Sequence, residues 1–113
     1  MSNGRMFNRE IVQTKRFLEM PASSQALFFH LGLNADDDGI VQAWKVMNLT
    51  RASEDDLKIL VSKGFVIPLC PEDYVFLISD WRRHNTIRAD RYKPGLYHDL
   101  LVQMYPEALV SPK

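Results

Sequence analysis

The sequence predicts a single α+β domain with the element order of a winged helix-turn-helix. An apolar helix is followed by a short β-prone pair and a second helix. A third helix then begins at a capping signal, and two apolar runs flanking a proline-containing loop form a hairpin. With 113 residues, of which 46% are hydrophobic and 25% charged, the chain is long enough for one core but too short for two.

The first helix is expected to start within Pro21–Ser24 and to continue through Gln25–Ala35, where few positions are polar. It should therefore lie at the centre of the core. His30 belongs to this apolar stretch, and we expect a buried, hydrogen-bonded core histidine without a function. Asp36–Gly39 ends the helix with turn-forming residues, and Ile40-Val41 is long enough only to bridge one other strand.

The second and third helices follow closely. Residues 43–49 place four apolar side chains over about two turns. Ser53 then predicts an N-cap, with Asp56 three residues later taking the place of Glu in a capping box. The third helix is expected to run over Glu54–Lys63 and to stop at Gly64, the usual residue after a helix C-terminus.

The C-terminal half predicts a hairpin and a last helix. Phe65–Leu69 and Tyr74–Ile78 should pair as antiparallel strands around the loop Cys70–Asp73. Apolar residues between positions 97 and 104 predict a short amphipathic helix before Pro106. We expect residues 1–97 to form a winged-helix DNA-binding domain. Residues 98–113 should form a C-terminal helix and tail that packs on the core, pairs with a second subunit or leads into a further domain of a longer protein.

The charge distribution suggests a nucleic-acid partner although the net charge is zero. Residues 20–81 have a balance of −5, whereas residues 82–93 hold five cations against Asp90 alone, a balance of +4. Clustered cations can bind phosphates because counterion release depends on local charge. The alternative is a solvated face, or a basic run that pairs with the acidic middle of the chain. Our candidate nucleic-acid-binding residues are Arg82, Arg83, His84, Asn85, Arg88, Arg91, Lys93, Lys45 and Arg51.

Aromatic residues are interleaved with these cations. We expect Trp81, Ile87 and Tyr92 to anchor the segment to the core while the basic groups face outward. His84 and Asn85 could donate to phosphates or read a base edge, and the aromatics could stack on an unpaired base.

Three segments resemble a known family. NADDDGIV at 34–41, SEDDLKILVSKGFV at 53–66 and WRRHNTIRADRYKPGLY at 81–97 look like the N-terminal domain of phage and prophage replisome organisers, which are related to the DnaD-type primosome proteins. The resemblance covers about Arg5 to Tyr97. It implies a winged-helix fold, DNA binding in replication initiation, self-association, contact with a helicase loader or another replication protein, and no catalysis. Family members end the last motif in Pro-Thr, whereas this chain has Pro94-Gly95.

Two features depart from an ordinary DNA reader. The third helix, which would be the recognition helix, begins with Glu54-Asp55-Asp56, and these carboxylates repel phosphates. The hairpin loop also lacks a cation. We therefore expect the DNA contacts to come from residues 82–93, helped by Lys45 and Arg51 and by Arg5 or Arg9.

Other classes of function find little support. The single cysteine, Cys70, permits no internal disulfide or cysteine-based zinc site, and Asp36–Asp38 fails as an EF-hand because Lys45 occupies the glutamate position. We expect no cofactor, no enzyme activity, no membrane span and no signal peptide, which suggests a cytoplasmic protein in a bacterial host. The open alternatives are a protein-interaction module and a winged-helix transcriptional regulator. We expect a homo-oligomer that associates through the N-terminal segment or the last helix, with single- or double-stranded DNA as the partner.

Overall fold

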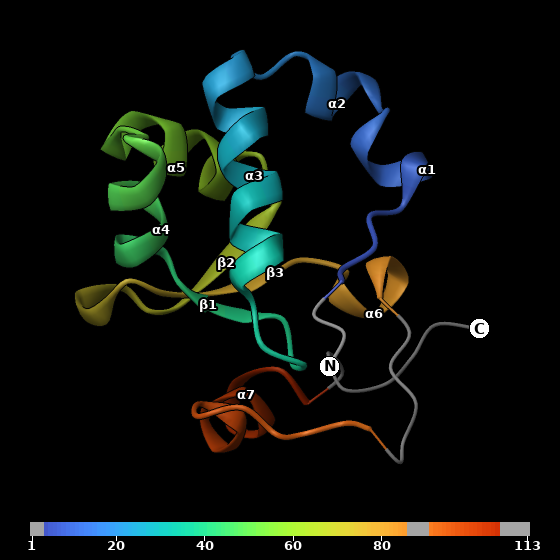
Figure 1. Ribbon diagram of the computed structural model, residues 1–113, viewed down its shortest axis with the longest axis vertical. Coiled ribbons are helices and arrows are strands. Elements are labelled where there is room, and N and C mark those ends of the chain that lie inside the picture. Colours follow the sequence, from blue (N-terminus) through green and yellow to red (C-terminus); the bar gives the residue numbers. More distant parts are fainter. Residues whose placement is uncertain (1–3, 86–90, 107–113) are drawn as a thin grey trace.

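A three-stranded antiparallel sheet lies between two sets of helices (Figure 1). The computed structural model describes residues 4–85 and 91–106. Its strands pair in the order β1-β3-β2, and three helices cover one face of the sheet while a C-terminal helix covers the other. The predicted α+β class is confirmed. The strands are β1 (Ile40–Gln42), β2 (Val66–Cys70) and β3 (Val75–Ile78), and the covering helices are α3 (Ala22–Asn34), α4 (Ala43–Thr50), α5 (Glu54–Ser62) and α7 (His98–Met104).

The central strand β3 is buried on both faces. Phe76 and Ile78 belong to the core beneath the helices, whereas Val75 and Leu77 face the second core together with Leu101 of α7. Alternation of side chains along a strand explains this division, and burial on both sides explains why the segment reads as a continuous apolar run. The expected bridge at the first strand is confirmed, since Ile40 pairs with Leu77.

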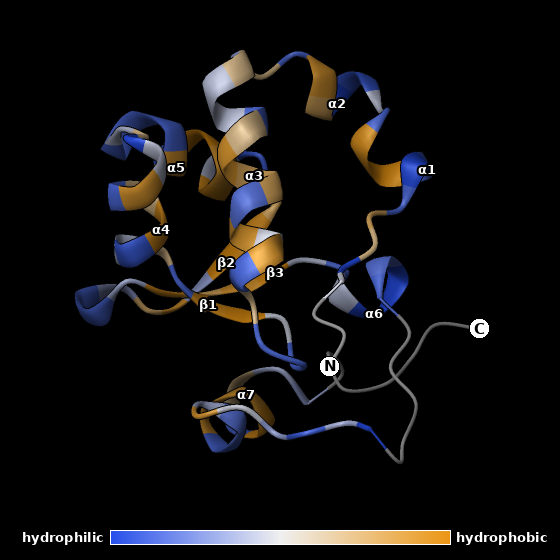
Figure 2. Cartoon of the chain, viewed as in Figure 1, coloured by the Kyte–Doolittle hydropathy of each residue, from blue (hydrophilic) through white to orange (hydrophobic). Residues whose placement is uncertain are grey.

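The second core shows where the last helix goes. Leu101 is fully buried against the sheet, so α7 packs on the core of the domain. Packing on the core was the first of the three possibilities expected for the last helix. Figure 2 shows the apolar strands between the helices, with hydrophilic colour on α6 (Trp81–His84) and on the loop between β2 and β3. Among the described residues, no helix is long and apolar enough to cross a membrane.

Helix α3 forms the centre of the larger core, as predicted. Phe28 and Leu31 are completely buried in it, and Phe28 makes edge-to-face contacts with Phe17 and two other rings at 5.3 to 6.0 Å. The expectation of a buried His30 is wrong: its side chain is exposed. His30 follows Phe28 by two positions, which is about 200° around the helix axis, so it lies on the solvent side.

The start of α5 is specified locally and then joined to α3. Ser53 and Asp56 form the reciprocal capping box that the sequence predicted. The Asp56 carboxylate also accepts a 2.6 Å hydrogen bond from the Ser23 hydroxyl of α3, which is the main reason the pKa of Asp56 lies below its ordinary value. This cap therefore fixes both the start of α5 and its position against α3.

Three one-turn helices were not predicted. These are α1 (Arg9–Val12), α2 (Lys15–Leu18) and α6, and a four-residue turn is too short to show helical periodicity. The N-terminal pair is nevertheless part of the core, because Ile11 and Phe17 are buried. The hairpin loop contains a further unpredicted turn, the 3-10 helix η1 (Pro71–Asp73).

Candidate nucleic-acid interface

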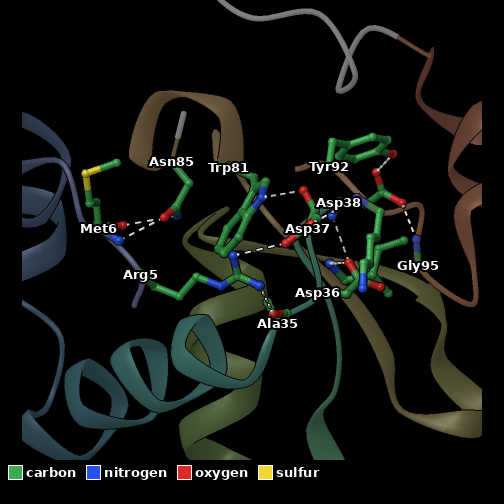
Figure 3. Close-up of polar contacts among 12 residues, drawn as sticks. Arg5, Met6, Ala35, Asp36, Asp37, Asp38, Trp81, Asn85, Tyr92 and Gly95 are labelled. Atoms are coloured by element: carbon green, nitrogen blue, oxygen red, sulfur yellow. Dashed lines mark hydrogen bonds and ion pairs between the residues drawn. The ribbon is translucent and has the colours of Figure 1, made fainter. Parts of the chain in front are cut away.

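The acidic turn after α3 joins parts of the chain that are far apart in the sequence (Figure 3). The Asp38 side chain is fully buried. Its carboxylate accepts hydrogen bonds from the Tyr92 hydroxyl and from the Gly95 amide at 3.0 Å, and it lies 3.0 Å from Nδ1 of His98. An Arg82 guanidinium nitrogen lies 3.7 Å from the same carboxylate. Asp38 therefore connects α6 and the 91–98 segment to the end of α3.

The neighbouring aspartates extend this connection. Asp37 accepts from the Arg5 guanidinium at 3.2 Å and from the Lys93 amide at 3.0 Å, and its carbonyl accepts from the Trp81 indole at 3.0 Å. Asp36 accepts from the amides of Asp38 and Ile40, which closes the turn. We call Asp36, Asp37 and Asp38 the acidic turn.

The electrostatics of the turn follow from burial and hydrogen bonding. Burial raises the pKa of Asp36 despite its backbone hydrogen bonds. For Asp38 burial acts in the same direction, but the hydrogen bonds from Tyr92, Gly95 and His98 outweigh it, and the net effect lowers its pKa. Burial and the Asp38 carboxylate raise the pKa of Tyr92 to about 12. Asp38 is thus an ionised group and Tyr92 a neutral donor at neutral pH.

Arg82 is occupied by this turn. Its side chain is only 13% exposed, and its guanidinium carbon lies 5.3 Å from the centre of the Tyr92 ring. Its buried Nε has no hydrogen-bond partner among the described residues. We expected Arg82 to face outward, but the structure gives it a structural position, because α6 directs it toward Asp38.

His84 and Asn85 are also buried, with 4% of each residue exposed. Nδ1 of His84 accepts from the Asn8 amide at 2.8 Å. The Asn85 side chain accepts from the Met6 amide and donates to the Met6 carbonyl, which pairs it with the N-terminal segment (Figure 3). Neither side chain reaches the surface, so the expected contacts with phosphate or a base edge are corrected to structural contacts that hold residues 6–8.

The buried imidazole predicts acid sensitivity. Burial lowers the pKa of His84 from its ordinary value of 6.5, so below that pH the unfolded chain binds more protons than the folded one. The contribution to stability is therefore complete above pH 6.5 and is lost as the pH falls through the lower folded pKa. Protonation would also place a proton on Nδ1, where the Asn8 amide now donates. We expect the free energy of unfolding, measured in urea, to decrease between pH 7.5 and 5.

The matched variant is His84→Asn, whose side-chain oxygen can accept from the Asn8 amide but does not titrate. It should be less stable than the wild type at pH 7.5, because it loses ring packing, and should lose less further stability on acidification. Equal pH dependence in the two proteins would show that His84 is not the titrating group.

The exposed cations among the candidate residues divide into two groups. Arg83, Arg91 and Lys93 are exposed on α6 and the segment after it, and no carboxylate among the described residues lies within ion-pair distance of them. Lys45 and Arg51 are exposed at the other side of the domain, on and after α4 (Figure 1). Arg88 lies outside the described residues, as does Ile87. The structure thus does not bring all the predicted residues together.

Acids accompany the second group. Lys45 shares a surface hollow with Glu72 and Asp73 of the hairpin loop, and Arg51 shares another with Glu54. These carboxylates reduce the local positive charge around α4. The first group is therefore the better candidate for a phosphate-binding surface.

Sequence reasoning missed the acidic turn as an organising element and Arg5 as one of its partners. Arg5 donates to the Ala35 carbonyl at 2.8 Å and lies over the Trp81 ring at 5.4 Å, so it is part of the fold. The sequence feature that could have indicated these contacts is the opposite charge of residues 20–81 and residues 82–93. Gly95 is required by a local contact, because a Cβ at this position would lie 1.8 Å from an Asp36 carboxylate oxygen.

The described residues contain no group of three or more His, Cys, Asp or Glu side chains arranged to hold a metal ion. Comparison with known proteins finds no matching family model, no similar curated protein and no similar solved structure.

Proposed function

We propose that this chain is a winged-helix domain that binds DNA through the exposed cations of α6 and the segment after it. The order α3, β1, α4, α5, β2, β3 supports the winged-helix assignment, as does the position of β1 beside β3 in the sheet. In this assignment α5 occupies the place of a recognition helix and the β2–β3 loop the place of the wing.

The observation that carries the DNA-binding proposal is the group of free cations on one side of the domain. Arg82 stacks on Tyr92, which places α6 beside residues 91–93, so Arg83, Arg91 and Lys93 lie on adjacent segments. Arg9 is close by, because the preceding residue, Asn8, donates to the Arg83 carbonyl. We call Arg9, Arg83, Arg91 and Lys93 the basic side of the domain.

The basic side suits phosphates better than base edges. Its cations lie on one-turn helices and an irregular segment, and no helix of groove-filling length carries them. Contacts of this kind position a protein on the backbone without reading sequence. We therefore propose binding without strong sequence preference, which favours an architectural role over operator recognition by a transcriptional regulator.

The role in replication rests on the family resemblance of the three segments described above. It suggests an initiation protein of phage or prophage origin that assembles on DNA and contacts a helicase loader. Self-association and the loader contact are part of this proposal.

Fluorescence anisotropy with short single- and double-stranded DNA at a series of salt concentrations tests the DNA proposal. Four phosphate contacts predict a slope of log affinity against log salt of about −3 to −4. Arg83→Ala/Arg91→Ala/Lys93→Ala should reduce the magnitude of the slope by about 2 to 3, because each lost contact removes roughly 0.9 on duplex DNA.

The control is Lys45→Ala/Arg51→Ala/Lys58→Ala, which removes the same number of positive charges from the α4–α5 side. It should bind nearly as the wild type does, with circular dichroism confirming both folds. Equal losses in the two variants would indicate a general charge effect, and an absence of wild-type binding at low salt would end the DNA proposal.

A further inference from the structure

An apolar groove runs between α5 and the β2–β3 hairpin. It has a volume of about 370 Å³. Leu57 and Val61 of α5 form one wall, and Pro68, Pro71, Tyr74 and Phe76 form the other. This groove lies where α5 and the wing would meet DNA in a DNA reader, yet its lining is mostly hydrocarbon. Such a surface gains little from phosphates and much from an apolar partner.

An aromatic pair, an exposed tryptophan and a half-buried tyrosine, extends the groove. Trp44 is 59% exposed, and its ring meets the Tyr74 ring edge to face with the centres 5.6 Å apart. Tyr74 adopts a left-handed backbone conformation, with φ at 56°, and its hydroxyl donates to Glu54. A bulky residue seldom adopts this conformation, so the position of the ring is maintained at a cost in backbone energy. Exposed tryptophan and tyrosine side chains are the residues that most often anchor protein interfaces.

The end of the groove at the start of α5 and the loop tip is acidic. Glu54 and Asp55 lie in the first turn of α5, and Glu72 and Asp73 lie in η1. All four residues are exposed. Lys45 and Arg51 are the cations in the adjoining hollows, and Lys58 lines the groove itself, so the four acids leave this surface with a net charge of −1. A cationic partner is therefore favoured over a nucleic acid.

The backbone also indicates the shape of the partner. Strand β2 is an edge strand, but Pro68 within it has no N–H to pair with an added strand. An extended peptide would thus gain an incomplete hydrogen-bond ladder at this edge. A helix needs no such ladder, since it places residues i, i+3, i+4 and i+7 into an apolar groove. The nine residues of α5 correspond to about 13 Å, enough to support two to three turns of a partner helix.

We propose that the groove between α5 and the hairpin is a docking site for a basic amphipathic helix of a protein partner. The partner's apolar side chains fill the groove and contact Trp44, while its lysines or arginines lie beside Glu54, Glu72 and Asp73. This site is separate from the basic side, so DNA and the partner helix can bind together.

The test uses three synthetic peptides of 18 residues and the ¹⁵N-labelled full chain. The first peptide is a helix of leucine and lysine with one apolar face. The second replaces lysine with glutamate, and the third is a scrambled version of the first. We expect the first peptide alone to shift the amide signals of Leu57, Val61 and Phe76 and the indole signal of Trp44, in a saturable titration.

Two variants localise the binding. Val61→Lys places a charge in the wall of the groove and should weaken the first peptide at least about tenfold, and Trp44→Ala should weaken it comparably. Val102→Lys is the matched control, because Val102 is 41% exposed on α7, across the sheet from the groove. It should leave the affinity unchanged, and circular dichroism confirms that all three variants are folded.

Several results would overturn the proposal. These are equal binding of the acidic or scrambled peptide, shifts that fall outside the groove, or no binding by any peptide. Shifts of the same groove signals by duplex DNA, or competition between DNA and the first peptide, would assign the face to nucleic acid instead. A negative result with the peptides would not change the salt dependence expected for DNA binding.

Discussion

Asp38→Asn is expected to destabilise the protein by about 3 kcal/mol or more, because breaking a buried charged network leaves its remaining partners unpaired. The Asp38 carboxylate faces the Tyr92 hydroxyl, the Gly95 amide, His98 and Arg82. An asparagine of the same shape turns one acceptor oxygen into a donor and removes the charge opposite Arg82. A domain of this size is stable by roughly 5 to 15 kcal/mol, so the loss is a large fraction of the total.

Urea denaturation followed by circular dichroism measures this loss. The 91–98 segment and α7 should also become more accessible, because Asp38 connects them to the end of α3. Limited proteolysis should therefore cleave the variant faster within residues 91–106. The control is Asp55→Asn, an exposed carboxylate in the first turn of α5, whose loss should cost about 0.5 kcal/mol. Similar costs for the two variants would show that the buried network contributes little.

Gly39→Ala is expected to cost about 3 kcal/mol. The backbone φ at Gly39 is 85°, in the left-handed region that favours glycine. A Cβ there would also lie 2.4 Å from Cγ of Trp81. That ring has no room to withdraw, since Trp81 is 3% exposed and its indole donates to the Asp37 carbonyl. The total combines about 1 kcal/mol for the backbone with about 1 to 3 kcal/mol for overpacking.

Gly64→Ala separates the two contributions. Gly64 has nearly the same φ, 81°, but a Cβ at this position meets nothing within 4 Å. It should cost about 1 kcal/mol, and the effect of alanine on the unfolded chain is common to both variants. The difference between them, about 2 kcal/mol in urea denaturation, measures the contact with Trp81. A difference near zero would mean that the core around Trp81 adjusts freely.

The longer helices and the strands were predictable because the residues that specify them are close together in the sequence. The capping box at Ser53 and the glycine after α5 determine that helix without reference to the rest of the chain. The apolar runs around the hairpin loop likewise predict β2 and β3, within one residue at their starts. Helix α6 was not predictable, because a single turn has no periodicity and its position depends on distant contacts.

The candidate site was predictable only as a concentration of charge. Arg82 and Arg83 are adjacent in the sequence and equally basic, yet one is held at Asp38 and the other is exposed. The contact that separates them joins residues 44 positions apart, since Arg82 and Asp38 meet only in the folded chain. His84 and Asn85 likewise lose their expected role to Asn8 and Met6, more than 75 positions away.

The sequence by itself determined the α+β class, the order of the longer helices and strands and the cap at Ser53, because short-range hydrogen bonds and side-chain periodicity specify them. Only the tertiary structure decided which cations are free, because an acidic turn and a basic segment of opposite charge neutralise each other where the fold brings them together. Burial decided the rest: most polar groups inside a protein are paired, and the partner can come from any part of the chain.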